Sequence, residues 1–130
     1  MSDILNGLNP QQKEAVMHTE GPLLILAGAG SGKTRVLTHR IAYLIENGFA
    51  EPEDILALTF TNKAAKEMKE RAASLTGKAA DKMLITTFHS ACVRFLKNRM
   101  MLLGYKRGNF VIYDTDEQKK IIRTIFEETG

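Results

Sequence analysis

The chain is poor in the residues that cross-link proteins or hold them in membranes. It has one cysteine, Cys92, and no tryptophan among its 130 residues, so it can form no disulfide framework of its own. No apolar run approaches the roughly 20 residues that a membrane-spanning helix needs. The first residues, Met1-Ser2-Asp3, lack the basic and apolar segments of a signal peptide. We therefore expect a cytoplasmic protein that does not enter a membrane.

Charge is distributed unevenly along a chain of otherwise ordinary globular composition, with 44% hydrophobic and 25% charged residues. The net charge of +3 divides into −2 over residues 1–65, with five basic and seven acidic side chains, and +5 over residues 66–130, with thirteen and eight. No acid lies between Asp81 and Asp114, and the basic residues of this window are Lys82, Arg94, Lys97, Arg99, Lys106 and Arg107. Such a window suits a phosphate backbone, or equally a solvated helix face.

The most informative stretch is the glycine loop at residues 27–34, Ala-Gly-Ala-Gly-Ser-Gly-Lys-Thr. An apolar run at residues 22–26 precedes it, and residues 35–44 have the apolar spacing of a helix. Strand, glycine loop and helix form the context of a phosphate-binding loop. The glycines would let backbone N–H groups turn toward phosphate oxygens, with Lys33 reaching the β- and γ-phosphates and the Thr34 hydroxyl ligating Mg²⁺. The first position is alanine, where the strict pattern has glycine.

A motif near the N-terminus predicts a capped helix. Asn9 is expected as the N-cap, Pro10 as the first helical residue and Gln12 as the third, where its side chain can fold back on the N-cap amide. The same carboxamide also offers a donor and an acceptor to the edge of a purine. Both the capping role and the adenine-binding role stay open for Gln12.

The alternation of apolar runs and helical patterns predicts an α/β fold. Buried strands are expected at residues 23–26, 55–58 and 83–85, and a helical pattern follows each of them. Two polar clusters, at residues 59–65 and 87–90, stand at the carboxyl ends of the second and third strands. Open parallel sheets bind their ligands there.

The individual residues of these clusters also have plain structural explanations. Thr61 or Asn62 can simply cap the following helix, and Phe60 can belong to the core. A single histidine such as His89 is more commonly a hydrogen-bonding residue than a catalyst, and it has no metal-ligating partner at a suitable spacing.

Two residues further along carry chemistry that the core or a helix cap can also explain. Cys92 lies on the apolar stripe of the helix after the third strand, so we expect it in the core. Asp114 follows an apolar run, as the Mg²⁺-binding acid of a P-loop enzyme does. With Glu117 three residues on, it equally predicts a capping box at the start of the last helix.

Four motifs together resemble those of superfamily 1 DNA helicases of the UvrD, PcrA and Rep type. They lie at residues 8–12, 27–35, 59–65 and 87–90, in the order and with the spacing of that family. The resemblance implies a RecA-like P-loop fold, an α/β three-layer arrangement of a parallel sheet with helices on both faces, here incomplete. It also implies that residues 1–107 are the amino-terminal part of the ATP-binding motor domain and that residues 108–130 start an inserted helical subdomain.

The resemblance also implies roles for individual residues. The implied ATP-binding residues are Gln12, Gly28, Ala29, Gly30, Ser31, Gly32, Lys33, Thr34 and Arg35. Lys33 and Thr34 are also the implied catalytic residues, with Thr34 as the Mg²⁺ ligand. The residues implied to contact single-stranded DNA are Phe60, Thr61, Asn62, Thr87 and His89. An aromatic ring beside small hydroxyl and amide groups suits DNA, because it can stack a base and bind a phosphate without reading sequence.

The activity implied is that of an ATP- and Mg²⁺-dependent 3′-to-5′ DNA helicase of repair or replication. Its partners would be single-stranded DNA, duplex junctions and the remainder of the helicase chain. The later motifs of the family are absent from these residues, so we expect an amino-terminal portion that is inactive alone. Two alternatives remain: a self-contained P-loop phosphotransferase using Asp114 with Arg94 or Arg99, and a non-enzymatic module that binds nucleotide or single-stranded DNA.

Overall fold

The computed structural model describes residues 3–28, 30–97, 99–106 and 111–129. The chain divides into two compact units, Met1–Cys92 and Val93–Gly130, and each is described by itself. The expected domain boundary between residues 107 and 108 lies outside the described residues. No helix in the described ranges is long and apolar enough to cross a membrane.

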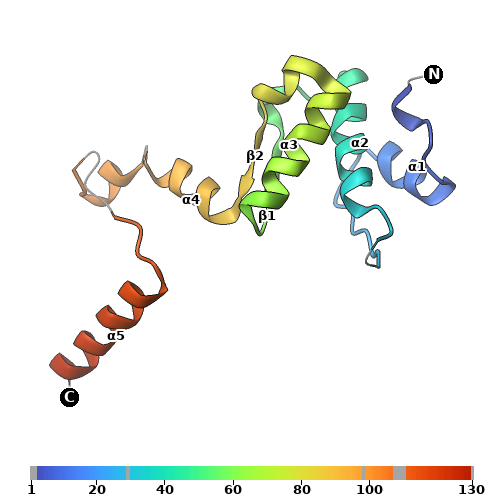
Figure 1. The fold of residues 1–130 in the computed structure, drawn as a ribbon. Coiled ribbons are helices and arrows are strands. Elements are labelled where there is room, and N and C mark those ends of the chain that lie inside the picture. Colours follow the sequence, from blue (N-terminus) through green and yellow to red (C-terminus); the bar gives the residue numbers. More distant parts are fainter. Residues whose placement is uncertain (1–2, 29, 98, 107–110, 130) are drawn as a thin grey trace. The chain divides into compact units, whose positions relative to one another are not determined.

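The first unit alternates helices with two short strands (Figure 1). Its elements in chain order are η1 (Asp3–Leu5), α1 (Pro10–Met17), α2 (Lys33–Glu46), η2 (Pro52–Asp54), β1 (Leu56–Thr59), α3 (Asn62–Thr76), η3 (Gly77–Asp81), β2 (Leu84–Thr87) and the start of α4 (Phe88–Lys97). Helix α2 follows the glycine loop directly and ends at Glu46, with Asn47 as its C-cap. The helix starts and stops are therefore close to those that apolar spacing and capping residues predict.

The sheet consists of β1 and β2, which pair in parallel from Leu56 opposite Leu84 to Thr59 opposite Thr87. Helix α3 connects the two strands and packs against both (Figure 1), because a parallel pair needs a long crossover. The last residues of the two strands, Thr59 and Thr87, are paired with each other. The residues that follow Thr59 and Thr87 are thereby brought to one edge of the sheet.

Two small cores hold α2 between α1 and α3 (Figure 1). In one of them, Ile41 of α2 packs with Ala72 of α3 and with Met83 before β2. In the other, Val16 of α1 is fully buried with Leu8 and with Val36 of α2. The helix that begins at the glycine loop is thus fixed on both sides by buried apolar side chains.

Residues 23–26 do not form the strand that their apolar run predicts. They have no regular secondary structure, and Leu24 and Leu26 are 81% and 87% exposed. A strand needs a neighbouring strand to complete its hydrogen bonds, and the described residues place none beside this segment. The α/β class is confirmed, but the described residues form a sheet of two strands and do not show the expected three-layer sheet.

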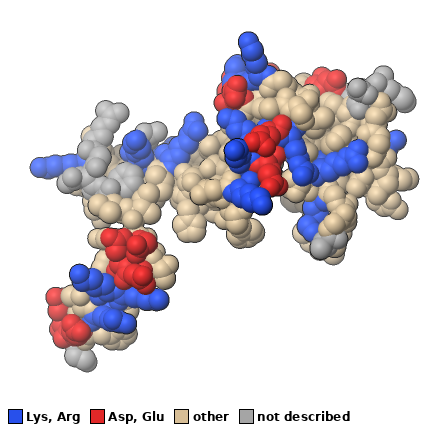
Figure 2. Space-filling view, in the orientation of Figure 1, with Lys and Arg blue, Asp and Glu red and all other residues tan. Residues whose placement is uncertain are grey.

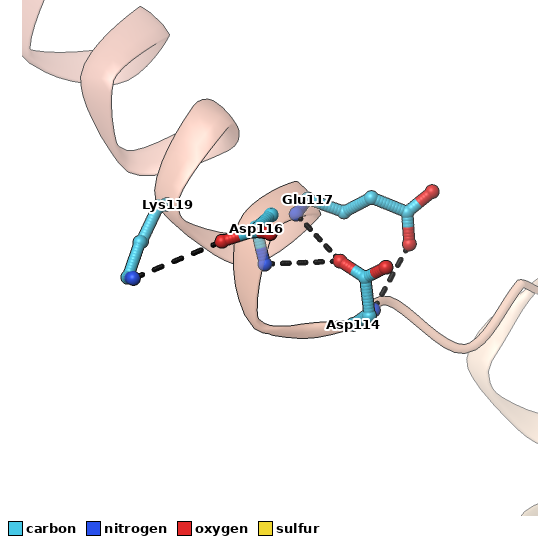
Figure 3. Close-up of polar contacts among 4 residues, drawn as sticks. All are labelled: Asp114, Asp116, Glu117 and Lys119. Carbon is cyan, nitrogen blue, oxygen red and sulfur yellow. Dashed lines mark hydrogen bonds and ion pairs between the residues drawn. The ribbon is translucent and has the colours of Figure 1, made fainter.

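The second unit contains the end of α4, η4 (Met100–Leu103) and α5 (Thr115–Thr129). A capping box opens α5, as Figure 3 shows. The Asp114 carboxylate accepts hydrogen bonds from the backbone N–H groups of Asp116 and Glu117, each at 2.9 Å, and the Glu117 carboxylate accepts one from the N–H of Asp114 at 2.9 Å. The predicted capping role of Asp114 is confirmed, because both ends of the box are formed.

Cys92 is exposed, so the expectation of a core cysteine is wrong. Its apolar neighbours on α4 are open as well, with Phe95 45% and Leu96 47% exposed. An amphipathic pattern shows which face of a helix is apolar but not whether another element covers that face. In the described part of the chain this face stays exposed.

The edge of β1 predicts association between copies of the chain. A groove of about 390 Å³ lies between β1, α2 and α3, and Leu56 on its wall is 48% exposed. Because unpaired strand edges are templates for pairing, light scattering is expected to show dimers or larger species at high concentration. Leu56→Lys, which puts a charge on this edge, is expected to reduce them. Leu102→Lys, at an 82% exposed position on η4, is the control; a monomer at every concentration would contradict the prediction.

Candidate functional site

The glycine loop turns into α2 through two residues in the left-handed region. Gly30 has φ 76° and Gly32 has φ 86°, a conformation that costs residues with a Cβ about 1–2 kcal/mol. Gly28 does not have a positive φ, and Ala29 lies outside the described residues. Gly32 is the N-cap of α2 and has no side chain to cap it. The first N–H groups of α2 are therefore left for a ligand, as in an anion-binding helix terminus.

Lys33 lies across the mouth of this loop. Its Nζ donates hydrogen bonds to the carbonyl oxygens of Ala27 at 3.1 Å and Gly28 at 2.9 Å. The Ser31 hydroxyl donates to the Gly28 carbonyl at 2.7 Å. The loop thus holds its only ammonium group beside the start of α2, where a phosphate would meet it.

Gln12 links α1 to the loop. Its Oε1 accepts the Asn9 N–H at 3.0 Å and its backbone N–H donates to the Asn9 side chain at 2.8 Å, which confirms the predicted capping box. Its Nε2 also donates to the Ser31 carbonyl at 3.1 Å. A carboxamide has two N–H donors and two acceptor lone pairs, so Gln12 keeps one of each. The cap leaves it able to pair with one further donor and one further acceptor.

A cleft of about 290 Å³ lies between α1 and the loop. Four of the sequence-predicted ATP residues line it, namely Gln12, Gly28, Ser31 and Lys33. The sequence interpretation missed its apolar wall, which includes Ile25 and Val36. The sequence shows that both residues are apolar, but it does not show that they line this cleft. The cleft therefore combines apolar and polar lining residues, as small-molecule sites do.

Thr34 and Arg35 do not line this cleft. Thr34 is the second residue of α2, at the positive end of the helix, and its carbonyl accepts the Thr38 hydroxyl at 3.0 Å. The Arg35 guanidinium lies against Gly7, since a Cβ on that glycine would come within 2.8 Å of it. Arg35 is thus placed beside the segment that leads into α1.

A second group of residues gathers where β1 and β2 end. The rings of Phe60 and Phe88 lie 5.4 Å apart between centroids, because each follows one of the paired residues Thr59 and Thr87. Phe60 is 90% exposed and Phe88 is 46% exposed. Phe60 is therefore not a core residue, which removes that explanation for it. Phe88 belongs to the predicted motif at residues 87–90 but was not among the individual DNA residues, although its place after a strand is the same as that of Phe60.

The other predicted DNA residues divide into helix caps and open side chains. The Thr61 hydroxyl accepts the Ala64 N–H at 3.1 Å and caps α3. Thr87 is buried, and its hydroxyl donates to the Ser90 hydroxyl at 3.0 Å and accepts the Ser90 N–H at 3.3 Å. Asn62 and His89 are exposed. The exposed surface at this edge is thus formed by aromatic, amide and imidazole groups.

The charges around α3 are mixed rather than purely basic. Figure 2 shows Lys and Arg side chains among Asp and Glu there, and one of the ion pairs joins Lys69 to Asp81 at 3.6 Å. Lys82, the first base of the acid-free window, pairs with Glu53 at 2.9 Å. Their hydrogen bond lowers the pKa of Glu53 and raises the pKa of Lys82. Lys82 is therefore less available to a phosphate backbone than its sequence position indicates.

These features define an α/β domain with a glycine loop at the N-terminus of a helix and an aromatic pair at the carboxyl end of two parallel strands. The family model described as the UvrD/REP helicase N-terminal domain matches residues 8–130, and the chain belongs to that family.

Its relatives are much longer proteins. The chain is 57% identical over 127 residues to the ATP-dependent DNA helicase PcrA of Bacillus subtilis, which covers 98% of the chain and 17% of the relative. It is 54% identical to the ATP-dependent DNA helicase PcrA of Staphylococcus aureus, again over 127 residues, 98% of the chain and 17% of the relative. It is also 51% identical to the ATP-dependent DNA helicase UvrD1 of Mycobacterium bovis, over 98% of the chain and 16% of the relative. The chain thus spans about a sixth of the length of these curated relatives.

Proposed function

We propose that the chain is the ATP- and single-stranded-DNA-binding amino-terminal part of an ATP-dependent DNA helicase. The observation that carries the proposal is the cleft in which Gln12, Ser31 and Lys33 meet over the glycine loop. This arrangement occurs in a chain of the UvrD/REP helicase family. It provides hydrogen-bonding groups for a base at one end and a cation with a helix N-terminus for phosphates at the other.

Each part of the nucleotide has a partner in this proposal. Gln12 uses its remaining N–H donor and lone pair on adenine, which presents a matching acceptor and donor. The loop N–H groups from Gly28 to Gly32 and the Lys33 ammonium bind the phosphates. Arg35 lies beside the nucleotide on the side of Gly7.

Mg²⁺ fits the donor groups at the start of α2. Thr34 offers a hydroxyl oxygen there, and a hard cation of this kind is held by one or two protein oxygens together with phosphate oxygens. The described residues contain no group of three His, Cys, Asp or Glu side chains that would hold a metal by themselves. When bound there, Mg²⁺ would supply positive charge that offsets the charge of the phosphates.

The DNA part of the proposal rests on the exposed aromatic pair. Phe60 and Phe88 offer stacking faces for bases, and His89, Asn62 and the capped Thr61 offer polar groups for the backbone. Thr87 would act by shaping this edge, since its hydroxyl is bonded to Ser90. Such a surface binds single strands without reading their sequence.

Membership of the helicase family supports a proposal on the wider setting. We propose 3′-to-5′ movement, action at duplex junctions in DNA repair or replication, and a cytoplasmic location. The remainder of the helicase chain would be the partner that completes the motor. Residues 108–130 would start its inserted helical subdomain, and the helical character of α5 supports this assignment.

Titration of a labelled oligonucleotide at low salt tests the DNA surface. Weak binding without sequence preference is expected, and it should fall as salt rises because phosphate contacts release counterions. Phe60→Ala should weaken binding by about 1–3 kcal/mol, the value of one base stacked on an aromatic ring, and His89→Ala should weaken it less.

Phe49→Ala provides the matched control, because Phe49 is another exposed phenylalanine, 55% accessible, whose ring stacks on Tyr43 of α2 and not on Phe88. Its binding should equal that of the wild type. Unchanged binding in both Phe60→Ala and His89→Ala would place the DNA site elsewhere.

A further inference from the structure

We infer that Arg40 is a positioning residue for the nucleotide site, acting through α1 on Gln12. The inference rests on the proposed adenine contact of Gln12. Arg40 lies on α2, seven residues after Lys33, which places it about 10 Å along the helix from the loop. Its Nη1 donates hydrogen bonds to the carbonyl oxygens of Ala15, at 2.8 Å, and of His18. Both carbonyls belong to the carboxyl end of α1.

The carboxyl end of α1 needs such a partner. The last carbonyl groups of a helix receive no hydrogen bond from within the helix. A cation beside them is also stabilised by the negative end of the helix dipole. Helix α1 has eight residues and only Val16 is buried, whereas isolated helices of this length are not stable in water. The two bonds from Arg40 therefore add to the packing of Val16 with Leu8 and Val36 in holding α1 on α2.

The opposite end of α1 carries Gln12. There the side chain completes the capping box with Asn9 and reaches the Ser31 carbonyl at 3.1 Å. A closed circuit results: the glycine loop continues into α2, Arg40 of α2 holds the carboxyl end of α1, and Gln12 at the amino end of α1 returns to the loop. The direction of the Gln12 carboxamide thus depends on where Arg40 holds α1.

The circuit separates base binding from phosphate binding. If Arg40 loses its donors, α1 shifts or frays and Gln12 no longer presents its free N–H and lone pair to the base. The phosphate-binding groups belong to the loop and to the start of α2, where Gly30 and Gly32 have left-handed φ and Lys33 is the first helical residue. Gln12 contacts this turn at the Ser31 carbonyl, so movement of α1 is expected to affect the base contact more than the phosphate contacts. A direct effect of the Arg40 charge on the phosphates is small, since about 10 Å is a full Debye length at 0.1 M salt.

Binding of ATP and of inorganic tripolyphosphate, measured by calorimetry on the full chain, tests the inference. Arg40→Met keeps the aliphatic stem and removes the donors. It is expected to weaken ATP about fivefold, the value of one lost hydrogen bond between neutral groups such as Gln12 and the base, and to leave tripolyphosphate unchanged. Arg40→Lys, which restores a cation, should recover part of the ATP affinity. Gln12→Ala should weaken ATP similarly, and the double variant Gln12→Ala with Arg40→Met should weaken it no further.

Arg71→Met, which removes an exposed arginine of α3, is the control and should bind both ligands as the wild type does. An equal loss of ATP and tripolyphosphate in Arg40→Met, no loss at all, or losses that add in the double variant would each overturn the role of Arg40. A wild-type chain that binds neither ligand would instead overturn the proposed function, and the inference with it. Wild-type binding without preference for ATP over tripolyphosphate would remove the base contact on which Arg40 is argued to act.

Discussion

Lys33→Ala is expected to abolish binding of ATP and ADP in calorimetry, while the wild-type chain binds both and releases almost no phosphate. Lys33 supplies the only ammonium at the loop, now bonded to the carbonyls of Ala27 and Gly28. Its loss removes charge-assisted hydrogen bonds worth about 1.5–3 kcal/mol each, and the two bonds that hold the loop closed go with it. Lys63→Ala, at an exposed lysine of α3, should bind nucleotide normally.

Turnover needs groups beyond the loop. P-loop enzymes hold Mg²⁺ with the loop Ser or Thr and an acid on another strand. They also use a group that orients the attacking water and an arginine worth on the order of 10³ to 10⁵ in rate. In the described residues only Thr34 of this set has a defined place at the start of α2. Phosphate release near the blank, with or without single-stranded DNA, is therefore the expected result.

The alternative of a self-contained phosphotransferase predicts measurable phosphate release instead. A substitution at Asp114 distinguishes this alternative from the helicase-portion proposal. Asp114→Asn preserves a good N-cap residue for α5 while removing the carboxylate charge. Phosphate release on the order of 1 per second, lost in both Lys33→Ala and Asp114→Asn, would establish Asp114 as a metal ligand in a complete phosphotransferase. The Asp114 carboxylate already accepts the Glu117 N–H, and the Glu117 carboxylate accepts the Asp114 N–H. This capping box favours a structural role for Asp114.

Gly32→Ala is expected to weaken nucleotide binding at least tenfold and to lower the free energy of unfolding by about 1–2 kcal/mol. Gly32 has φ 86°, where a Cβ is strained, and that Cβ would lie 3.1 Å from Nε2 of Gln12. The substitution therefore disturbs both the start of α2 and the contact between Gln12 and Ser31. Calorimetry with ATP and denaturant unfolding measure the two effects.

Gly28→Ala is the matched control within the same loop. Gly28 has no positive φ, and a Cβ there would meet nothing within 4 Å. We expect its stability to stay near that of the wild type and its nucleotide affinity to fall less than in Gly32→Ala. Equal effects of the two substitutions would show that left-handed geometry at Gly32 is not what shapes the loop.

Local signals in the sequence were enough to place the loop, the helices and their caps. Glycine alone tolerates positive φ, so the repeated glycines correctly predicted a tight turn, realised at Gly30 and Gly32. The caps at Asn9 and Asp114 depend on residues three positions apart, and both formed as predicted. These features were predictable because every atom that decides them lies within one turn of the chain.

The errors arose where a distant segment decides the outcome. Residues 23–26 have the composition of a buried strand, yet a strand requires a partner and the described residues supply none. Cys92 was expected in the core because it lies on an apolar stripe, and it is exposed. Phe60, for which the core was the alternative to a DNA contact, is exposed as well. Hydrophobic pattern reports the preference of a side chain for burial but not the presence of a surface to bury it against.

The sequence by itself therefore determined the family, the glycine turn before α2 and the local caps, since their signals are short and carried by residue type. Only the tertiary structure decided that Gln12 reaches Ser31, 19 residues away, and that Arg40 holds the far end of the same helix. It also decided that Phe60 meets Phe88, through the parallel register of β1 and β2. Such contacts depend on how separate elements pack. The free energy that favours one packing comes from all the buried residues together and not from the few residues that come into contact.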